Sequence, residues 1–152
     1  MTTMTEQATQ VYSVFIRATP EQVWDGITKP EFTTRYFYGS RIESTFEPGS
    51  SYLGLAGDGD QQLVDGEVLE SDPPRLLRHT WRALYDPDTA AEHPSRVTWE
   101  IEAQDGGVTK LTVVHDQLEG APKTAESVAG GWMYVLSGLK TLLETGEPLQ
   151  SA

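Results

Sequence analysis

The stretch VAGGWMYVLSGLKTLLETG, residues 128–146, decides the fold class of this 152-residue chain. Its apolar side chains recur at spacings of three and four, which places them in one stripe along a helix. We expect this helix to run from about Lys123 to Glu144 and to end at Gly146, because glycine is common at helix C-termini. The stripe consists of Val128, Trp132, Val135, Leu136, Leu139, Leu142 and Leu143.

Gly130, Gly131 and Gly138 lie inside this predicted helix, and each costs about 1 kcal/mol relative to alanine. Two interpretations stay open. The glycines reflect a frayed first turn and close packing on the sheet, or they leave room for a ligand or a bend.

Upstream of the helix, the sequence is rich in strand-forming segments divided by turn residues such as Pro48-Gly49 and Asp105-Gly106-Gly107. Short turns between successive strands are typical of an antiparallel meander. The expected strands are Val11–Arg17, Arg41–Phe46, Ser51–Ala56, Gln62–Glu70, Arg75–Tyr85, Ser95–Ala103 and Val108–Asp116.

Two short helices are expected after the first strand. Thr19 and Gln22 have the spacing of a capping box, and Pro20 suits the first helical position. This helix should end before Pro30, where a second one begins and runs to about Phe37.

A sheet of about seven strands must cover one face, and the C-terminal helix is the only large amphipathic element available. We therefore expect an α+β fold in which a curved antiparallel sheet wraps around that helix. Residues 10–149 should form one domain, preceded by a disordered tail of residues 1–9.

Composition limits the partners and the compartment. Acidic residues outnumber basic ones 23 to 11, for a net charge of -12. Such a surface repels phosphate backbones and anionic lipids, so we expect no nucleic acid and no membrane insertion, although acidity also simply keeps a protein soluble. The chain has no cysteine and no recognisable secretory signal, which favours the cytoplasm.

The sequence has none of the common catalytic motifs: no G-x-S-x-G, no P-loop and no G-x-G-x-x-G after a strand. Histidines and carboxylates also lack the spacing typical of metal ligands. We therefore expect no metal and no cofactor.

Strand alternation predicts which side chains face the helix. The inward sets are Leu77, His79, Trp81 and Ala83, then Val97, Trp99 and Ile101, and finally Leu111, Val113 and His115.

These inward side chains are either the lining of a cavity for an apolar molecule or a closed core. Three aromatic residues, Tyr36, Phe37 and Tyr52, are candidates for its mouth. The other candidate ligand-binding residues are His79, Trp81, Trp99, Val113, His115, Trp132, Leu136 and Leu139.

His79 and His115 are the only inward-facing ionisable candidates. Each is a hydrogen-bonded core histidine, a group that orients a ligand, or a general base. His93 lies in the loop DPDTAAEHPS and should be solvated.

Four segments carry a family resemblance: IRATPEQVWDGITKPEFTTRYFYG (16–39), FEPGSSY (46–52), GEVLESDPPRLLRHTW (66–81) and GGWMYVLSGLKTLLETGEPL (130–149). Together they resemble the activator of heat-shock-protein-90 ATPase homologue family, within the START-like (SRPBCC) superfamily. The resemblance covers about Val11 to Leu149. It implies the helix-grip fold, with a cavity between the sheet and the last helix.

The superfamily mostly binds lipids, sterols, polyketides and other apolar molecules, with some cyclases and hydrolases. Three functions therefore stay open, and we favour the first: binding of a small hydrophobic or aromatic molecule. The second is a cyclase or hydrolase that acts on an aromatic polyketide-like substrate through His79 or His115. The third is activation of a chaperone ATPase. Met133 and Tyr134 lie off the helix stripe, where they could form a homodimer surface.

Overall fold

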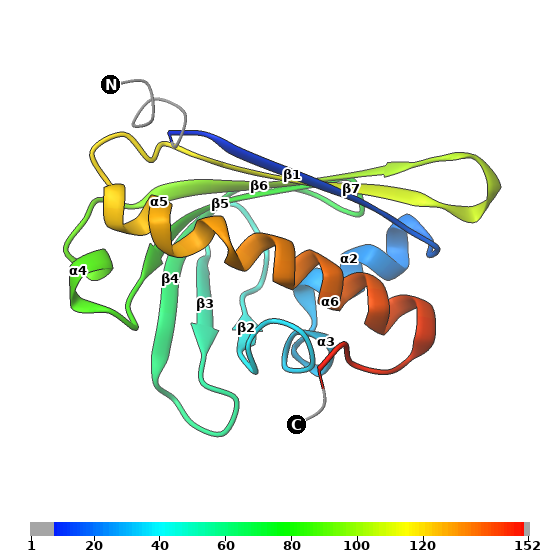
Figure 1. Ribbon diagram of the computed structural model, residues 1–152, viewed down its shortest axis with the longest axis horizontal. Helices are drawn as coiled ribbons and strands as arrows, with labels where there is room; N and C mark the ends of the chain where they lie inside the picture. The colour runs from blue at the N-terminus through cyan, green and yellow to red at the C-terminus, as the bar shows by residue number, and fades with distance from the viewer. Residues whose placement is uncertain (1–7, 151–152) are drawn as a thin grey trace.

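The computed structural model describes residues 8–150, which form one curved antiparallel sheet with two consecutive helices along its concave side (Figure 1). The seven strands follow the order β1-β7-β6-β5-β4-β3-β2. This is the predicted α+β helix-grip arrangement. The strands are β1 (Gln10–Ile16), β2 (Arg41–Glu43), β3 (Ser51–Leu55), β4 (Gln62–Asp72), β5 (Leu76–Ala83), β6 (Ser95–Ala103) and β7 (Thr109–Asp116).

Residues 1–7 of the expected N-terminal tail lie outside the described residues. Ala8, the first described residue, is buried. Its carbonyl accepts a hydrogen bond from the Leu118 N–H over 3.3 Å.

The capping box predicted for the first helix, α2 (Pro20–Thr28), is confirmed. The Gln22 N–H donates to Thr19 Oγ1 over 3.1 Å, and the Thr19 N–H donates to Gln22 Oε1 over 2.8 Å. The next helix, α3 (Pro30–Thr33), is shorter than predicted. The chain turns toward β2 after it, with Tyr38 and Gly39 both at positive φ.

The predicted C-terminal helix has the expected extent but is interrupted at Gly130, which separates α5 (Pro122–Ala129) from α6 (Gly131–Thr145). Gly146 ends α6 in the left-handed region with φ 80°, as predicted. Gly138 is closely packed, but against the segment between α3 and β2 rather than against the sheet, since a Cβ there would lie 3.1 Å from Tyr36 Cβ.

The inward sets predicted for β5, β6 and β7 are confirmed, because all their members are buried. Gly66 allows β4 to approach β5: a Cβ at this position would lie 2.0 Å from the Thr80 carbonyl oxygen. A register shift between Val68 and Glu70 interrupts the same strand pair. Such irregularities bend strands, and this is the region where the sheet turns toward the helices (Figure 1).

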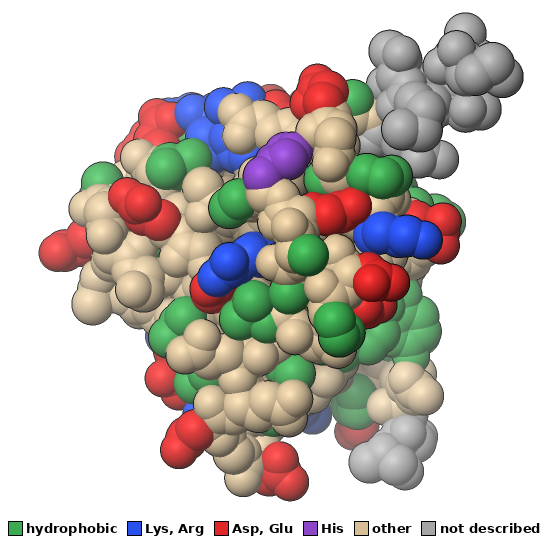
Figure 2. Space-filling view, turned by 90° about the vertical axis from the view of Figure 1, so that its left-hand side faces the viewer, with side chains coloured by type: hydrophobic (Ala, Val, Ile, Leu, Met, Phe, Trp, Pro, Cys, Tyr) green, Lys and Arg blue, Asp and Glu red, His purple; other side chains and the backbone are tan. Residues whose placement is uncertain are grey.

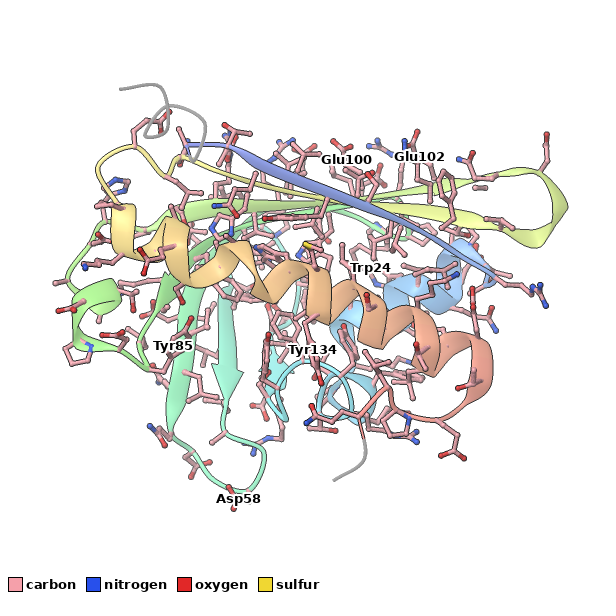
Figure 3. All side chains as sticks on the ribbon, viewed as in Figure 1. Trp24, Asp58, Tyr85, Glu100, Glu102 and Tyr134 are labelled. Atoms are coloured by element: carbon pink, nitrogen blue, oxygen red, sulfur yellow. The ribbon has the colours of Figure 1, made fainter. Side chains whose placement is uncertain are left out.

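Polar side chains occupy the outer face of the sheet. Figure 3 shows Glu100 and Glu102 pointing away from the helices. Arg82 pairs with Asp65, Arg96 with Asp116 and Arg78 with Glu70. In the view of Figure 2, acidic side chains are spread over the surface, with hydrophobic ones between them. Within residues 8–150, no helix has the length and apolar character needed to cross a membrane.

Two short elements complete the fold. The helix α4 (Pro87–Ala90) connects β5 to β6, and the 3-10 turn η1 (Asp105–Gly107) connects β6 to β7.

Candidate functional site

A cavity of about 400 Å³ lies between the curled part of the sheet and the junction of α5 with α6. Its lining is aliphatic and aromatic. The polar side-chain atoms of the lining residues are hydroxyl oxygens and indole nitrogens. None of these lining side chains carries a charge. The lining residues are Phe37, Tyr38, Ser40, Ile42, Gly54, Leu63, Val64, Trp81, Tyr85, Ser127, Val128, Gly131 and Trp132.

Small residues line the cavity on two sides. Gly54 belongs to β3, which pairs with β2 and β4 in the curled part of the sheet. Gly131 begins α6 immediately after the helix break. Apart from the adjoining residues and the helix backbone, the Tyr38 hydroxyl oxygen, at 3.5 Å, is the one atom of residues 8–150 within 4 Å of where a Cβ would lie. The glycine therefore leaves space that a larger side chain would fill, which supports the second interpretation of the helix glycines.

Two tyrosines form the exposed part of the lining. Tyr38 is 64% exposed and Tyr85 is 50% exposed. The Tyr38 ring stacks on that of Tyr134 of α6, with centroids 5.6 Å apart, and the Tyr85 hydroxyl lies 2.7 Å from Ser127 Oγ of α5. Figure 3 shows Tyr85 and Tyr134 on the same side of the two helices. Partial burial and the neighbouring tyrosines raise the pKa of Tyr38, so its hydroxyl stays protonated at neutral pH.

Aromatic rings form the buried part of the lining. The Phe37 ring lies nearly parallel to that of Trp81, with centroids 6.3 Å apart and an interplanar angle of 21°. The Trp132 ring meets Phe37 edge to face at 5.9 Å and lies 5.6 Å from Trp81. These rings present flat apolar surface, which suits stacking with a planar ligand.

His79 is buried beside this aromatic group but does not line the cavity. Its Nε2 accepts a hydrogen bond from Trp99 Nε1 over 3.0 Å, so the neutral ring carries its proton on Nδ1, which donates to the Thr80 carbonyl over 2.9 Å. The ring also stacks on Tyr52 at 3.7 Å. Burial lowers the pKa of His79 to about 4, although the Thr80 hydrogen bond opposes this.

His115 has the opposite tautomer. Its Nδ1 accepts from Trp132 Nε1 over 2.9 Å, which leaves the proton on Nε2, 2.6 Å from Ser95 Oγ. The Ser95 hydroxyl can then donate to the Trp81 carbonyl, 3.3 Å away. Burial, together with the neighbouring His79, lowers the pKa of His115 to about 3. All ring nitrogens of both histidines are thus engaged inside the protein.

The structure brings three of the predicted ligand-binding residues, Phe37, Trp81 and Trp132, into the cavity lining. Tyr36 is buried, donates through its hydroxyl to the Gly26 carbonyl over 2.7 Å, and contributes to a second cavity of about 500 Å³ beside Pro148–Gln150. The other candidates pack in the buried core: Tyr52, His79, Trp99, Val113, His115, Leu136 and Leu139.

Sequence reasoning did not find most of the remaining lining residues, which come from β2–β4, the α3–β2 turn, the segment between β5 and α4, and the α5–α6 junction. The glycine pair at 130–131 was the available signal, since it marks the break beside the cavity. Gly131 was among the helix glycines considered as leaving room for a ligand. The residues missed are Tyr38, Ser40, Ile42, Gly54, Leu63, Val64, Tyr85, Ser127 and Val128.

Within residues 8–150, no group of three or more histidine, cysteine, aspartate or glutamate side chains is arranged to hold a metal ion.

Solved structures share this fold. DynU16, a protein in the dynemicin biosynthetic locus, matches with a TM-score of 0.76 and 23% identity, over 95% of this chain and 50% of DynU16. The Aha1 dimer from Colwellia psychrerythraea matches with a TM-score of 0.70 and 16% identity, over 91% of this chain and 97% of that one. PFC0360w, an HSP90 activator from Plasmodium falciparum, matches with a TM-score of 0.68 and 20% identity, over 90% and 96% of the two chains.

No curated protein sequence matches the chain. The family model described as "Activator of Hsp90 ATPase homolog 1-like protein" matches residues 17–144. This match covers most of the chain and agrees with the helix-grip architecture. The chain therefore belongs to the activator of Hsp90 ATPase homolog 1-like family.

Proposed function

We propose that this protein binds a small hydrophobic or aromatic molecule in the cavity between the curled sheet and the C-terminal helices. The observation that carries the proposal is the cavity of about 400 Å³ with an uncharged, largely aromatic lining. Its volume falls in the range typical of small-molecule sites. Apolar surface moved from water into such a site contributes about 25 cal/mol per Å².

The ligand class that fits this lining is a polyketide-like aromatic. Phe37, Trp81 and Trp132 supply flat ring surface, and the hydroxyls of Tyr38 and Tyr85 supply polar contacts at the exposed end. The similarity in fold to DynU16, a protein in the dynemicin biosynthetic locus, is in keeping with binding of a small molecule.

A cyclase or hydrolase that uses His79 or His115 as general base fits the geometry less well. Neither histidine lines the cavity, and both accept a hydrogen bond from an indole N–H. A general base needs a free lone pair within reach of the substrate proton. Activation of a chaperone ATPase, suggested by the name of the family, would instead require a protein-binding surface.

We place this binding function in the cytoplasm, in keeping with the absence of cysteine from the sequence. Met133 is 62% exposed and adjoins Tyr134 on α6, so we propose this surface for a homodimer contact. The dimeric Aha1 relative supports that proposal.

The test is native mass spectrometry of the purified protein, followed by a thermal-shift screen against flavonoids, aromatic polyketides and lipids. A ligand at 100 times its Kd stabilises the folded state by about 2.7 kcal/mol, which raises Tm by several degrees. A ligand that stays bound in the native mass spectrum, or a saturable rise in Tm, supports the proposal.

A pair of variants then locates the site. Leu63→Trp adds a large ring to the cavity wall from a half-buried position and should abolish the shift. Leu69→Trp makes the same change on β4 at an exposed position outside the lining and should preserve it. If the two variants respond alike, binding occurs elsewhere. A purified protein that retains no bound ligand, shows no thermal shift with any compound and stimulates a chaperone ATPase would favour the ATPase-activator function.

A further inference from the structure

Tyr38 belongs to two cavities at once. The first cavity is the proposed binding site of about 400 Å³, and the second is the cavity of about 500 Å³ beside Pro148–Gln150. Within residues 8–150, Tyr38 is the one residue that lines both. The two cavities therefore adjoin at this side chain.

The segment around Tyr38 runs between the two cavities. Phe37 and Ser40 line the first cavity, whereas Tyr36 and Gly39 line the second. Tyr36 and Phe37 are buried, and their ring centroids lie 5.8 Å apart. The wall between the cavities thus has core side chains at its base, and Tyr38 is its exposed part.

The Tyr38 side chain extends this wall as far as α6. Its hydroxyl oxygen lies 3.5 Å from the position of a Cβ on Gly131, which lines the first cavity. Its ring stacks on Tyr134, which lines the second cavity, with centroids 5.6 Å apart. Gly131 and Tyr134 are three positions apart and so lie on one side of the helix, and Figure 3 shows Tyr134 on the same side as Tyr85 of the first cavity.

We propose that Tyr38 limits the length of the ligand, because its side chain closes the first cavity toward the second. This inference rests on the proposed function and narrows its ligand class. The ligand is a compact, uncharged aromatic molecule held within the first cavity, and long-chain lipids are excluded. Without the Tyr38 ring the two cavities would join, and Tyr134, Pro148 and Leu149 would offer apolar surface to a longer molecule.

The probes that test this limit are 6-acyl-2-(dimethylamino)naphthalenes, an uncharged fluorescent series that runs from the acetyl to the dodecanoyl compound. All members share one aromatic head and differ in the length of the acyl chain. Each methylene that enters an apolar cavity should raise the affinity about fourfold, whereas a methylene left in water adds little. For the wild-type protein we expect the affinity to rise along the series and to stop rising at the chain length that fills the first cavity.

Tyr38→Ala should extend this limit. A compound two methylenes beyond the wild-type limit should bind this variant about 15-fold more tightly than it binds the wild-type protein, because its chain enters the second cavity. The substitution should leave the core intact, since Tyr38 is exposed, and the Tm of the variant checks this. Tyr38→Phe keeps the ring and should keep the wild-type limit.

Two further variants locate the added chain. Tyr85→Ala is the matched control, because Tyr85 is also exposed but lines the first cavity alone. It should change the affinity of the whole series without moving the limit. Thr34 is half-buried and lines the second cavity, so Thr34→Trp added to Tyr38→Ala should fill that space and restore the wild-type limit.

The outcomes separate the length limit from the binding function. A wild-type affinity that rises along the entire series overturns the role of Tyr38 but leaves cavity binding intact. The same holds for a limit that Tyr38→Ala leaves unchanged, that Tyr85→Ala moves equally, or that stays extended after Thr34→Trp is added. Failure of every member of the series to bind the wild-type protein contradicts the proposed function itself.

Discussion

Trp132 of α6 and His115 of β7 are joined by a hydrogen bond in which the indole Nε1–H donates to the imidazole Nδ1 over 2.9 Å. Both residues are buried. The bond links the C-terminal helix to a central strand of the sheet, and it fixes the tautomer of the histidine. It also orients the Trp132 ring, one of the walls of the cavity.

We expect this bond to couple the two residues energetically. A double-mutant cycle with Trp132→Phe, His115→Phe and the double variant, followed by urea denaturation, should give a coupling free energy of about 1 kcal/mol. The cycle cancels the independent cost of lost volume at each site. A cycle on Trp24 and His115, which share no hydrogen bond, is the control and should give a value near zero. Equal couplings in the two cycles would contradict the role of the bond.

The buried histidines predict a loss of stability at acid pH. The folded-state pKa values of His79 and His115, about 4 and about 3, lie below the unfolded value of 6.5. Between these limits the unfolded chain binds more protons, so the free energy of unfolding falls as the pH falls. The expected slope between pH 6 and pH 5 is about 2 kcal/mol per pH unit for the two groups together.

Denaturant titrations across this range measure the slope. His79→Gln removes one titrating group and should reduce the slope by about half, whatever its effect on stability at neutral pH. An unchanged slope in this variant would show that the acid sensitivity arises elsewhere.

His93 should act in the opposite direction. Its Nδ1 lies 2.9 Å from the Pro94 carbonyl and its Nε2 lies 2.5 Å from the Glu119 carbonyl. Only the charged imidazole donates to both oxygens, and these two bonds raise the pKa of His93. Its stabilising contribution is therefore fully present below the unfolded pKa of 6.5 and is lost as the pH rises through the folded-state value.

Comparison of the wild-type protein with His93→Gln at two pH values isolates this contribution. The stability difference between them should be larger at pH 6 than at pH 8.5, because the His93 ring is charged at the lower pH and then donates both hydrogen bonds. His79 and His115 titrate identically in both proteins, so their contributions cancel from the difference. A difference that does not vary with pH would mean that the neutral ring serves equally well.

The features that the sequence predicts correctly are those set by neighbouring residues. Thr19 and Gln22 are three positions apart and form their capping box within one helical turn. Alternation along a strand likewise places Trp99 and Val113 on the buried face without knowledge of the partner strands. Both rest on local geometry that the chain carries with it.

The position of the cavity depends instead on long-range geometry. Of the β5–β7 side chains expected to line it, Trp81 does so, whereas others, such as Trp99 and His115, are covered by Trp132 and by one another. The open space lies where the sheet curls at β2–β4 and the helix breaks at Gly130. The alternation of side chains along a strand does not predict where the sheet curls or how the helix bends at Gly130. It therefore cannot distinguish a residue that lines the cavity from one that packs in the core.

The pairing of β1 with β7 constrains how the protein folds during synthesis. Gln10 lies opposite His115 and Ile16 lies opposite Thr109. Strand β1 leaves the ribosome before β7 and is therefore without this partner until about a hundred further residues have been made. Closing so long a loop is slow, and until then the apolar side of β1 is exposed. Nascent chains arrested before β7 emerges should be bound by holding chaperones and cut by proteases, whereas chains released after α6 should be protected.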